Sequence, residues 1–259
     1  MTTMSMMETI NAAHRLGLAA GALSSLFWTV TYALVVRQGA KDRLHGMPLV
    51  ALGANLAWEL IFLAVTLANR AYDERLAMLV PWTVLDVAIV VQCFRYGRAD
   101  FRDPLVVRHF GKGLACLLLF AGAVLFAFVR EMRDAIGWYA AFGQNLMMSA
   151  LFVAMLLRRD SVRGQSIYIA ISKFLGTFFA FVLALFWSPP TLHRHWDSLL
   201  PDGYHPISPL IVTLYTGIFI LDVAYIALVH RKSRALGLDP WRFRQTMSDG
   251  RQSSVTTIA

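Results

Sequence analysis

Four ionisable residues lie within long apolar stretches of the sequence: Glu59, Asp86, Lys173 and Asp222. A charged side chain at bilayer depth costs roughly 3 kcal/mol or more, so such residues usually serve a function. One lysine cannot neutralise three carboxylates, and burial favours the neutral form of a carboxyl group. We therefore expect at least one of these acids to be protonated, and a neutral carboxylic acid in an apolar pocket can act as a proton donor.

Polar and aromatic residues accompany these acids at helical spacing, since positions three or four apart share one face of a helix. Aromatic rings also stabilise cations, by about 0.5–2 kcal/mol each. We predict that the following residues contact the substrate or a cationic intermediate: Trp58, Trp82, Tyr225, Asn55, Asn145, Ser149 and Lys173. Ordinary core or lipid packing is the alternative for each aromatic residue. For the ionisable residues the alternative is buried ion pairs that only fix the packing.

The elements that position these residues follow from the composition. Hydrophobic residues make up 57% of the chain and charged residues 15%, against roughly 25% charged in soluble proteins. Because a helix crosses the membrane with about 20 mostly apolar residues, we predict an all-α polytopic membrane protein, a single domain of seven transmembrane helices over residues 1–259. The predicted spans are 16–36, 47–68, 76–94, 112–129, 138–157, 167–187 and 209–229.

The residues behind the net charge of +8 are distributed unevenly between the two sides of the membrane, and this distribution indicates the topology. Seventeen Lys and Arg residues lie on the side of the C-terminus and six on the side of the N-terminus. Positive residues collect in cytoplasmic loops, so we predict an outside N-terminus and a cytosolic C-terminus, which contacts anionic lipid. We expect no nucleic-acid partner. Twenty Arg against four Lys, with abundant Ala, suggests a GC-rich genome and favours the bacterial cytoplasmic membrane over the endoplasmic reticulum.

Other motifs offer weaker candidates. His193 and His195 form an H-x-H pair in the long proline-rich loop Ser188–Ser208, but no third metal ligand is evident. Gly17, Gly21 and Ser25 form a stripe of small residues that predicts close helix packing. The chain has no P-loop, dinucleotide-binding or catalytic-triad signature. We expect neither a metal nor a cofactor, and the sequence does not predict the oligomeric state.

Several segments together resemble a known family, and they cover nearly the whole chain. They are Gly53–Glu59, Trp82–Asp86, Gln144–Ser149, Arg158-Arg159, Gly164–Ser166, Gly176-Thr177 and Leu221-Asp222 with Tyr225. In order and placement they resemble the integral-membrane terpene cyclases of fungal meroterpenoid and indole-diterpene pathways, with bacterial relatives that act on farnesylated indoles.

The resemblance implies a reaction in which an epoxide or terminal alkene on a prenyl chain is protonated and rings then close through carbocations. It implies that Glu59 and Asp222 are the proton donor and its partner, with Asp86 as a supporting residue. The substrate would be a lipophilic prenylated small molecule, most simply a farnesylated one. No diphosphate has to leave, so this chemistry needs no metal.

Two other functional classes fit parts of the sequence. A seven-helix retinal protein would carry its Schiff-base lysine in the seventh span, whereas Lys173 lies in the sixth. A proton-coupled transporter would use the same carboxylates as a relay and would spread polar groups across the membrane. Three of the four ionisable residues are predicted in the cytosolic half, which favours a one-sided pocket instead.

Overall fold

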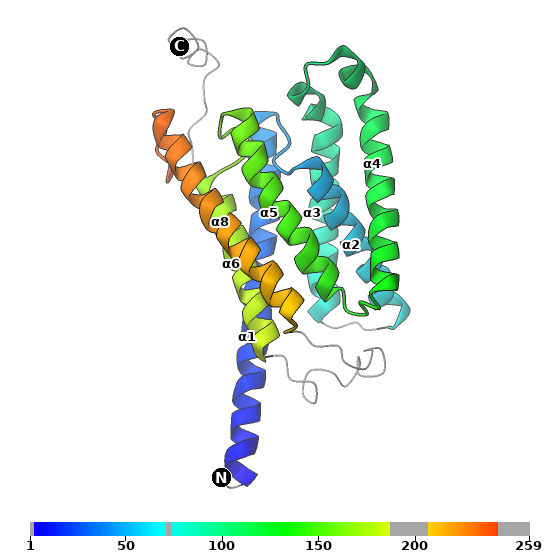
Figure 1. Ribbon diagram of the computed structural model, residues 1–259, viewed down its shortest axis with the longest axis vertical. Helices are drawn as coiled ribbons and strands as arrows, with labels where there is room; N and C mark the ends of the chain where they lie inside the picture. The colour runs from blue at the N-terminus through cyan, green and yellow to red at the C-terminus, as the bar shows by residue number, and fades with distance from the viewer. Residues whose placement is uncertain (1–2, 71–73, 187–206, 243–259) are drawn as a thin grey trace.

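The chain is described by a computed structural model that covers residues 3–70, 74–186 and 207–242. Within these ranges all regular structure is helical, and seven helices are long and apolar enough to cross a membrane, which confirms the predicted fold class (Figure 1). The elements are α1 (Thr3–Asp42), α2 (Leu49–Ala68), α3 (Glu74–Tyr96), the 3-10 helix η1 (Gly97–Asp100), α4 (Pro104–Glu131), α5 (Trp138–Arg159), α6 (Ile167–Phe186) and α8 (Pro209–Ala235).

Several helices are longer than predicted, and the largest differences are in three of them: α1 extends at both ends, α8 continues to Ala235, and α4 begins at Pro104 instead of near residue 112. The start of α4 has a clear local cause. Asp103 accepts hydrogen bonds from the backbone N–H groups of Leu105 at 2.8 Å and Val106 at 3.1 Å. A proline in the first helical turn lacks only an N–H that would be unpaired there anyway. The apolar pattern marks the part of a helix in the membrane, and the capping residues mark its ends.

The helices enclose an interior between α1, α2, α3, α5 and α6. Helix α1 packs against α6 and α3, α2 contacts α3, α4 and α5, and α8 packs against α5 and α6. Helix α4 lies at the margin of the bundle (Figure 1), and only 11% of the residues in its most apolar stretch are buried. Because it touches mainly α2, α4 supports the interior without lining it.

The small residues of α1 allow close packing on α6, as predicted. Gly17 and Gly21 face Phe186 and Leu183 of α6. The next contact in this seam is made by Ser24, whose hydroxyl donates to the backbone oxygen of Gly176 at 2.8 Å. Ser25, the third residue of the predicted stripe, bonds within its own helix. This seam fixes the position of α1 beside the interior.

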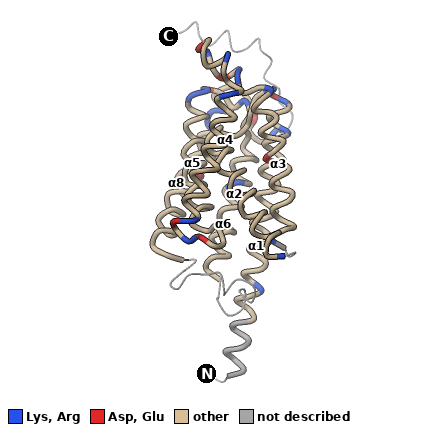
Figure 2. Tube along the Cα trace, turned by 90° about the vertical axis from the view of Figure 1, so that its right-hand side faces the viewer, with Lys and Arg blue, Asp and Glu red and all other residues tan. Residues whose placement is uncertain are grey.

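Lys and Arg residues gather at the end of the bundle where α8 ends, and few lie at the end where α1 begins (Figure 2). The start of α1 and the end of α8 lie at opposite ends of the bundle (Figure 1). This separation agrees with the charge count, while the assignment of the basic end to the cytosol stays a prediction. The loop with His193 and His195 falls outside the described residues up to position 206.

Candidate active site

A cavity of about 700 Å³ lies inside the bundle. Its wall comes from the middle of α1 and of α2, the starts of α3 and α5 and the second half of α6. The cavity therefore extends from the end of the bundle where α3 and α5 begin toward the middle of the bundle. The lining residues that carry polar or aromatic groups include Trp28, Thr29, Tyr32, Asn55, Trp58, Trp82, Trp138, Gln144, Asn145 and Thr177.

The cavity reaches the lipid-facing side of the bundle between α1 and α3. Leu18 and Leu26 of α1 line it and are also 44% and 55% exposed, and Ala77 of α3 is an exposed lining residue as well. A lipophilic molecule dissolved in the bilayer could therefore enter the cavity sideways, without crossing a polar surface.

Two of the predicted acids meet at the inner end of this cavity. The Asn55 side-chain nitrogen donates to Glu59 Oε1 at 3.0 Å and to Asp86 Oδ2 at 2.7 Å, and it lies 2.8 Å from the Tyr32 hydroxyl oxygen. Glu59 and Asp86 are both fully buried. Asn55 and Glu59 come from successive turns of α2, as their spacing predicts, and Asp86 joins them from α3.

No Lys, Arg or His in the described part of the chain forms an ion pair with Glu59 or Asp86. Two adjacent buried carboxylates without a countercharge would repel each other and lack solvation, so at least one must be neutral. Glu59 Oε2 and Asp86 Oδ1 have no hydrogen-bond partner among the described residues. The pair therefore holds a proton and has free oxygens to exchange it.

Lys173 and Asp222 form a separate buried group. The Lys173 ammonium donates to both Asp222 carboxylate oxygens, at 2.8 and 3.0 Å, and to the Ser149 hydroxyl at 2.7 Å. All three side chains are at most 1% exposed. The ammonium has three protons and three acceptor contacts, so this group is internally satisfied, and it matches the ion-pair alternative for these two residues.

The four ionisable residues do not face one cavity in the structure. None of the four belongs to the cavity wall, and Lys173 pairs with Asp222 alone. Because the lysine is committed to Asp222, it leaves the Glu59–Asp86 pair without a cation. The two groups are connected through aromatic rings, since the Trp28 ring lies 5.9 Å from the Lys173 ammonium and 5.7 Å from the Tyr32 ring.

The predicted contact residues divide between the cavity wall and the layer behind it. Asn55, Trp58, Trp82 and Asn145 line the cavity. Asn145 donates to the Thr177 hydroxyl at 2.7 Å. Ser149 and Lys173 lie behind the wall, in the ion-pair group. Tyr225 lies behind it too, where its hydroxyl donates to Gln165 Oε1 at 2.8 Å, so the cavity geometry gives no support to a substrate contact by Tyr225.

The two cavity tryptophans are held by hydrogen bonds. The Trp58 indole donates to the backbone oxygen of Gly137 at 2.9 Å, and Trp82 donates to the Thr29 hydroxyl at 2.9 Å. Gly137 precedes α5 with a φ of +76°, a conformation that favours glycine, and a side chain there would collide with Trp58 and Phe62. The ring faces of both tryptophans are thereby fixed in the wall.

Trp28 and Tyr32 of α1 were missed as candidate site residues. They lie one turn apart, both line the cavity, and both are buried. Their i, i+4 spacing is the same signal that identified Asn55 with Glu59. This spacing was not used to predict a site because neither residue is ionised at neutral pH and the apolar part of α1 contains no ionisable residue.

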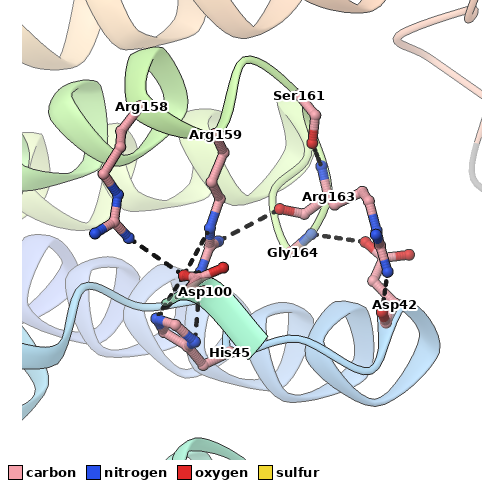
Figure 3. A network of polar contacts seen from close by, with 8 residues as sticks. All are labelled: Asp42, His45, Asp100, Arg158, Arg159, Ser161, Arg163 and Gly164. Carbon is pink, nitrogen blue, oxygen red and sulfur yellow. Dashed lines mark hydrogen bonds and ion pairs between the residues drawn. The ribbon is translucent and has the colours of Figure 1, made fainter. Parts of the chain in front are cut away.

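The basic segment Arg158-Arg159 ends α5 and therefore lies at the other end of the bundle, where it belongs to a network of polar contacts (Figure 3). Asp100 accepts hydrogen bonds from Arg158 at 3.2 Å and Arg159 at 2.5 Å, and Arg159 also donates to the ring of His45 at 3.1 Å. Asp42 accepts from the backbone N–H of Gly164 at 2.7 Å. These contacts tie the α1–α2 loop, η1 and the end of α5 together, so this network fixes the basic end of the bundle.

His45 in this network predicts a pH dependence. Burial, together with the neighbouring Arg159 guanidinium, lowers the pKa of His45 from 6.5 to about 4, although Asp100 opposes the shift. Between about pH 6.5 and 4 the unfolded chain binds a proton that the folded chain does not. The free energy of unfolding therefore falls as the pH falls through this window, by roughly 3 kcal/mol when the shift is fully realised.

The measurement is the melting temperature of detergent-solubilised protein between pH 7.5 and 4, for wild type and for His45→Gln, which cannot titrate. We expect the wild type to lose more stability than the variant between pH 6.5 and 4. Parallel curves would show that His45 is not buried in its neutral form.

The described residues contain no group of three or more His, Cys, Asp and Glu side chains placed to hold a metal ion. Cys93 and Cys116 are free thiols.

Comparison with known proteins gives a consistent result. Residues 11–233 match the family model of Pyr4-like transmembrane terpene cyclases. The chain is 32% identical over 212 residues to the Pyr4-family terpene cyclase mfmH of Annulohypoxylon moriforme, covering 78% of this chain and 80% of the relative. It is 33% identical over 215 residues to terpene cyclase idtB of Claviceps paspali (81% and 84%) and 27% identical over 218 residues to terpene cyclase pyr4 of Aspergillus fumigatus (81% and 83%). No solved structure gives a significant match.

Proposed function

The chain belongs to the Pyr4-like transmembrane terpene cyclases, and we propose that it protonates the terminal alkene or epoxide of a prenylated, farnesylated small molecule and closes rings through a carbocation cascade. The observation that carries this mechanism is the Glu59–Asp86 pair. It is a buried acid pair without a countercharge, at the inner end of a cavity lined by aromatic residues.

The cavity suits such a substrate. Its volume of about 700 Å³ lies within the range of roughly 300–1,000 Å³ typical of sites for drug-sized ligands. Trp28, Trp58 and Trp82 line it, and aromatic rings stabilise positive charge of the kind that moves along the prenyl chain during ring closure. The lateral opening between α1 and α3 admits a prenyl chain from the bilayer, and an apolar wall limits the water that would quench a carbocation.

The geometry refines the roles of the acids. Glu59 acts as proton donor, and its immediate partner is Asp86, because both share the Asn55 amide. Asp222 is bound through both oxygens to Lys173, so its influence on Glu59 is indirect. Loss of a proton from the final cation returns the acid pair to its starting state, and the product is an isomer of the substrate.

The protein is a multi-pass membrane protein. Its placement in the bacterial cytoplasmic membrane rests on composition alone, and the relatives named above are fungal. We include both the bacterial cytoplasmic membrane and the outward N-terminus in the proposal.

The test is product analysis by liquid chromatography and mass spectrometry. Membranes containing wild-type protein are supplied with a farnesylated indole or its terminal epoxide, and membranes containing Glu59→Gln serve as control. We expect a new isomer of unchanged mass from wild type alone, and the accepted substrate identifies the protonated group. Folded wild type that converts neither compound, nor analogues with longer prenyl chains, would contradict the proposal and favour proton-coupled transport.

A further inference from the structure

The acid pair does not reach the cavity by itself. Glu59 and Asp86 are absent from the cavity wall, whereas Tyr32 and Asn55 form the wall in front of them. A proton held by Glu59 must therefore pass another group before it meets a substrate in the cavity. The question is which wall residue can carry it.

Tyr32 is bound on the acid side and accessible on the cavity side. Its hydroxyl oxygen accepts a hydrogen bond from the Asn55 amide at 2.8 Å and lies beside the Glu59 carboxyl group. Glu59 Oε2 has no hydrogen-bond partner among the described residues. When the Glu59 carboxyl group is protonated it can donate to the phenol oxygen, and the Tyr32 proton is then free to point into the cavity.

The neighbouring wall residues offer no equivalent route. The Asn55 amide is committed as donor, and an amide N–H is a very weak acid. The Thr29 hydroxyl donates to the Ser25 backbone oxygen at 2.7 Å and accepts from Trp82. The Thr177 hydroxyl is bonded to Asn145 and to its own helix, on the side of the Lys173–Asp222 group.

We propose that Tyr32 is a catalytic proton relay between the Glu59–Asp86 pair and the substrate; this inference rests on the proposed cyclase function. The Tyr32 hydroxyl gives its proton to the alkene carbon or epoxide oxygen, while the Glu59 carboxylic acid gives its proton to the phenol oxygen. The O–H bond of Tyr32 breaks and re-forms in one step. The negative charge ends on the Glu59–Asp86 pair, and the proton later lost from the final cation restores it.

The ring of Tyr32 is held in place for this step. It packs edge-on against Trp82, with ring centroids 5.9 Å apart, and against Trp28 at 5.7 Å. The Asn55 N–H that points at the phenol oxygen stabilises negative charge as it develops there, as a preorganised donor does at an oxyanion. The same two tryptophans line the cavity, so the cation forms next to their rings.

The test compares Tyr32→Phe, which removes one oxygen, with Tyr168→Phe, which makes the same change outside the cavity, where the hydroxyl donates to the backbone of Trp241. General-acid groups contribute typically about 10²–10⁴-fold, so we expect kcat of Tyr32→Phe to fall at least about 10²-fold with little change in KM. Tyr168→Phe should match wild type. Wild-type kcat in folded Tyr32→Phe would overturn the relay.

A readout specific to proton transfer distinguishes a relay from a structural role. In mixtures of H2O and D2O, the wild-type kcat should depend on the deuterium fraction along a curve, because two protons move together, and a linear dependence would overturn the relay. If Tyr32→Phe does not fold, a fluorinated tyrosine at position 32 keeps the shape and changes the acidity of the phenol; a kcat that does not respond would overturn the relay. Absence of product from wild type would contradict the cyclase function itself.

Discussion

Replacement of Glu59 with Gln is expected to lower the cyclisation rate by about 10²–10⁴-fold, the usual contribution of a general acid, without unfolding the protein. Gln has nearly the same shape, and its side-chain oxygen can still accept the hydrogen bond that Asn55 donates to Glu59 Oε1. What it lacks is an acidic proton. The change also removes one of two buried carboxyl groups that have no countercharge, so the free energy of unfolding should stay the same or increase.

The measurement pairs product formation in membranes with the melting temperature in detergent. Glu131→Gln is the matched control, because it makes the same chemical change at an exposed residue at the end of α4 that does not line the cavity. We expect this control to behave as wild type in both assays. Turnover by Glu59→Gln at the wild-type rate would contradict the assignment of Glu59 as proton donor.

The sequence predicted the fold well, because the membrane imposes a simple rule. A span needs a long apolar segment, and all seven predicted spans fall on helices of the structure. The helix ends were predicted less well, since α1 and α8 continue beyond the apolar segment and α4 begins at its Asp103 cap. Hydropathy indicates which part of a helix lies in the lipid, but it does not indicate how far the helix extends beyond the lipid.

The site was predicted only as far as contacts within one helix allow. Asn55 and Glu59 are four residues apart, and their hydrogen bond follows from helical geometry. Which acid joins them from another helix depends on how α2, α3 and α8 are rotated and packed, and nothing in the spacing distinguishes Asp86 from Asp222. The same limit explains Tyr225, whose position one turn from Asp222 does not reveal that its hydroxyl turns to Gln165.

Asp222→Asn is expected to destabilise the protein by about 3–5 kcal/mol, since removal of one partner leaves the other charge buried without compensation. The Lys173 ammonium is fully buried, and both of its charged contacts are to Asp222. Only neutral acceptors would remain, the Asn amide oxygen and the Ser149 hydroxyl. For a protein of this size the loss corresponds to a fall in melting temperature on the order of 10 °C.

The double variant Asp222→Leu with Lys173→Met separates the ion pair from the individual charges. Replacing a whole buried pair with apolar residues of similar volume is often neutral or stabilising, so we expect the double variant to regain most of the stability lost in Asp222→Asn. A double variant as unstable as Asp222→Asn would mean that the ion pair stabilises the fold beyond the neutralisation of its two charges. With the fold restored, product analysis then assigns the role of Asp222. If the double variant cyclises the substrate, the role of Asp222 is to pair with Lys173. If it is folded but inactive, the pair is needed for the reaction, and Trp28 and Tyr32 connect it to the Glu59–Asp86 proton.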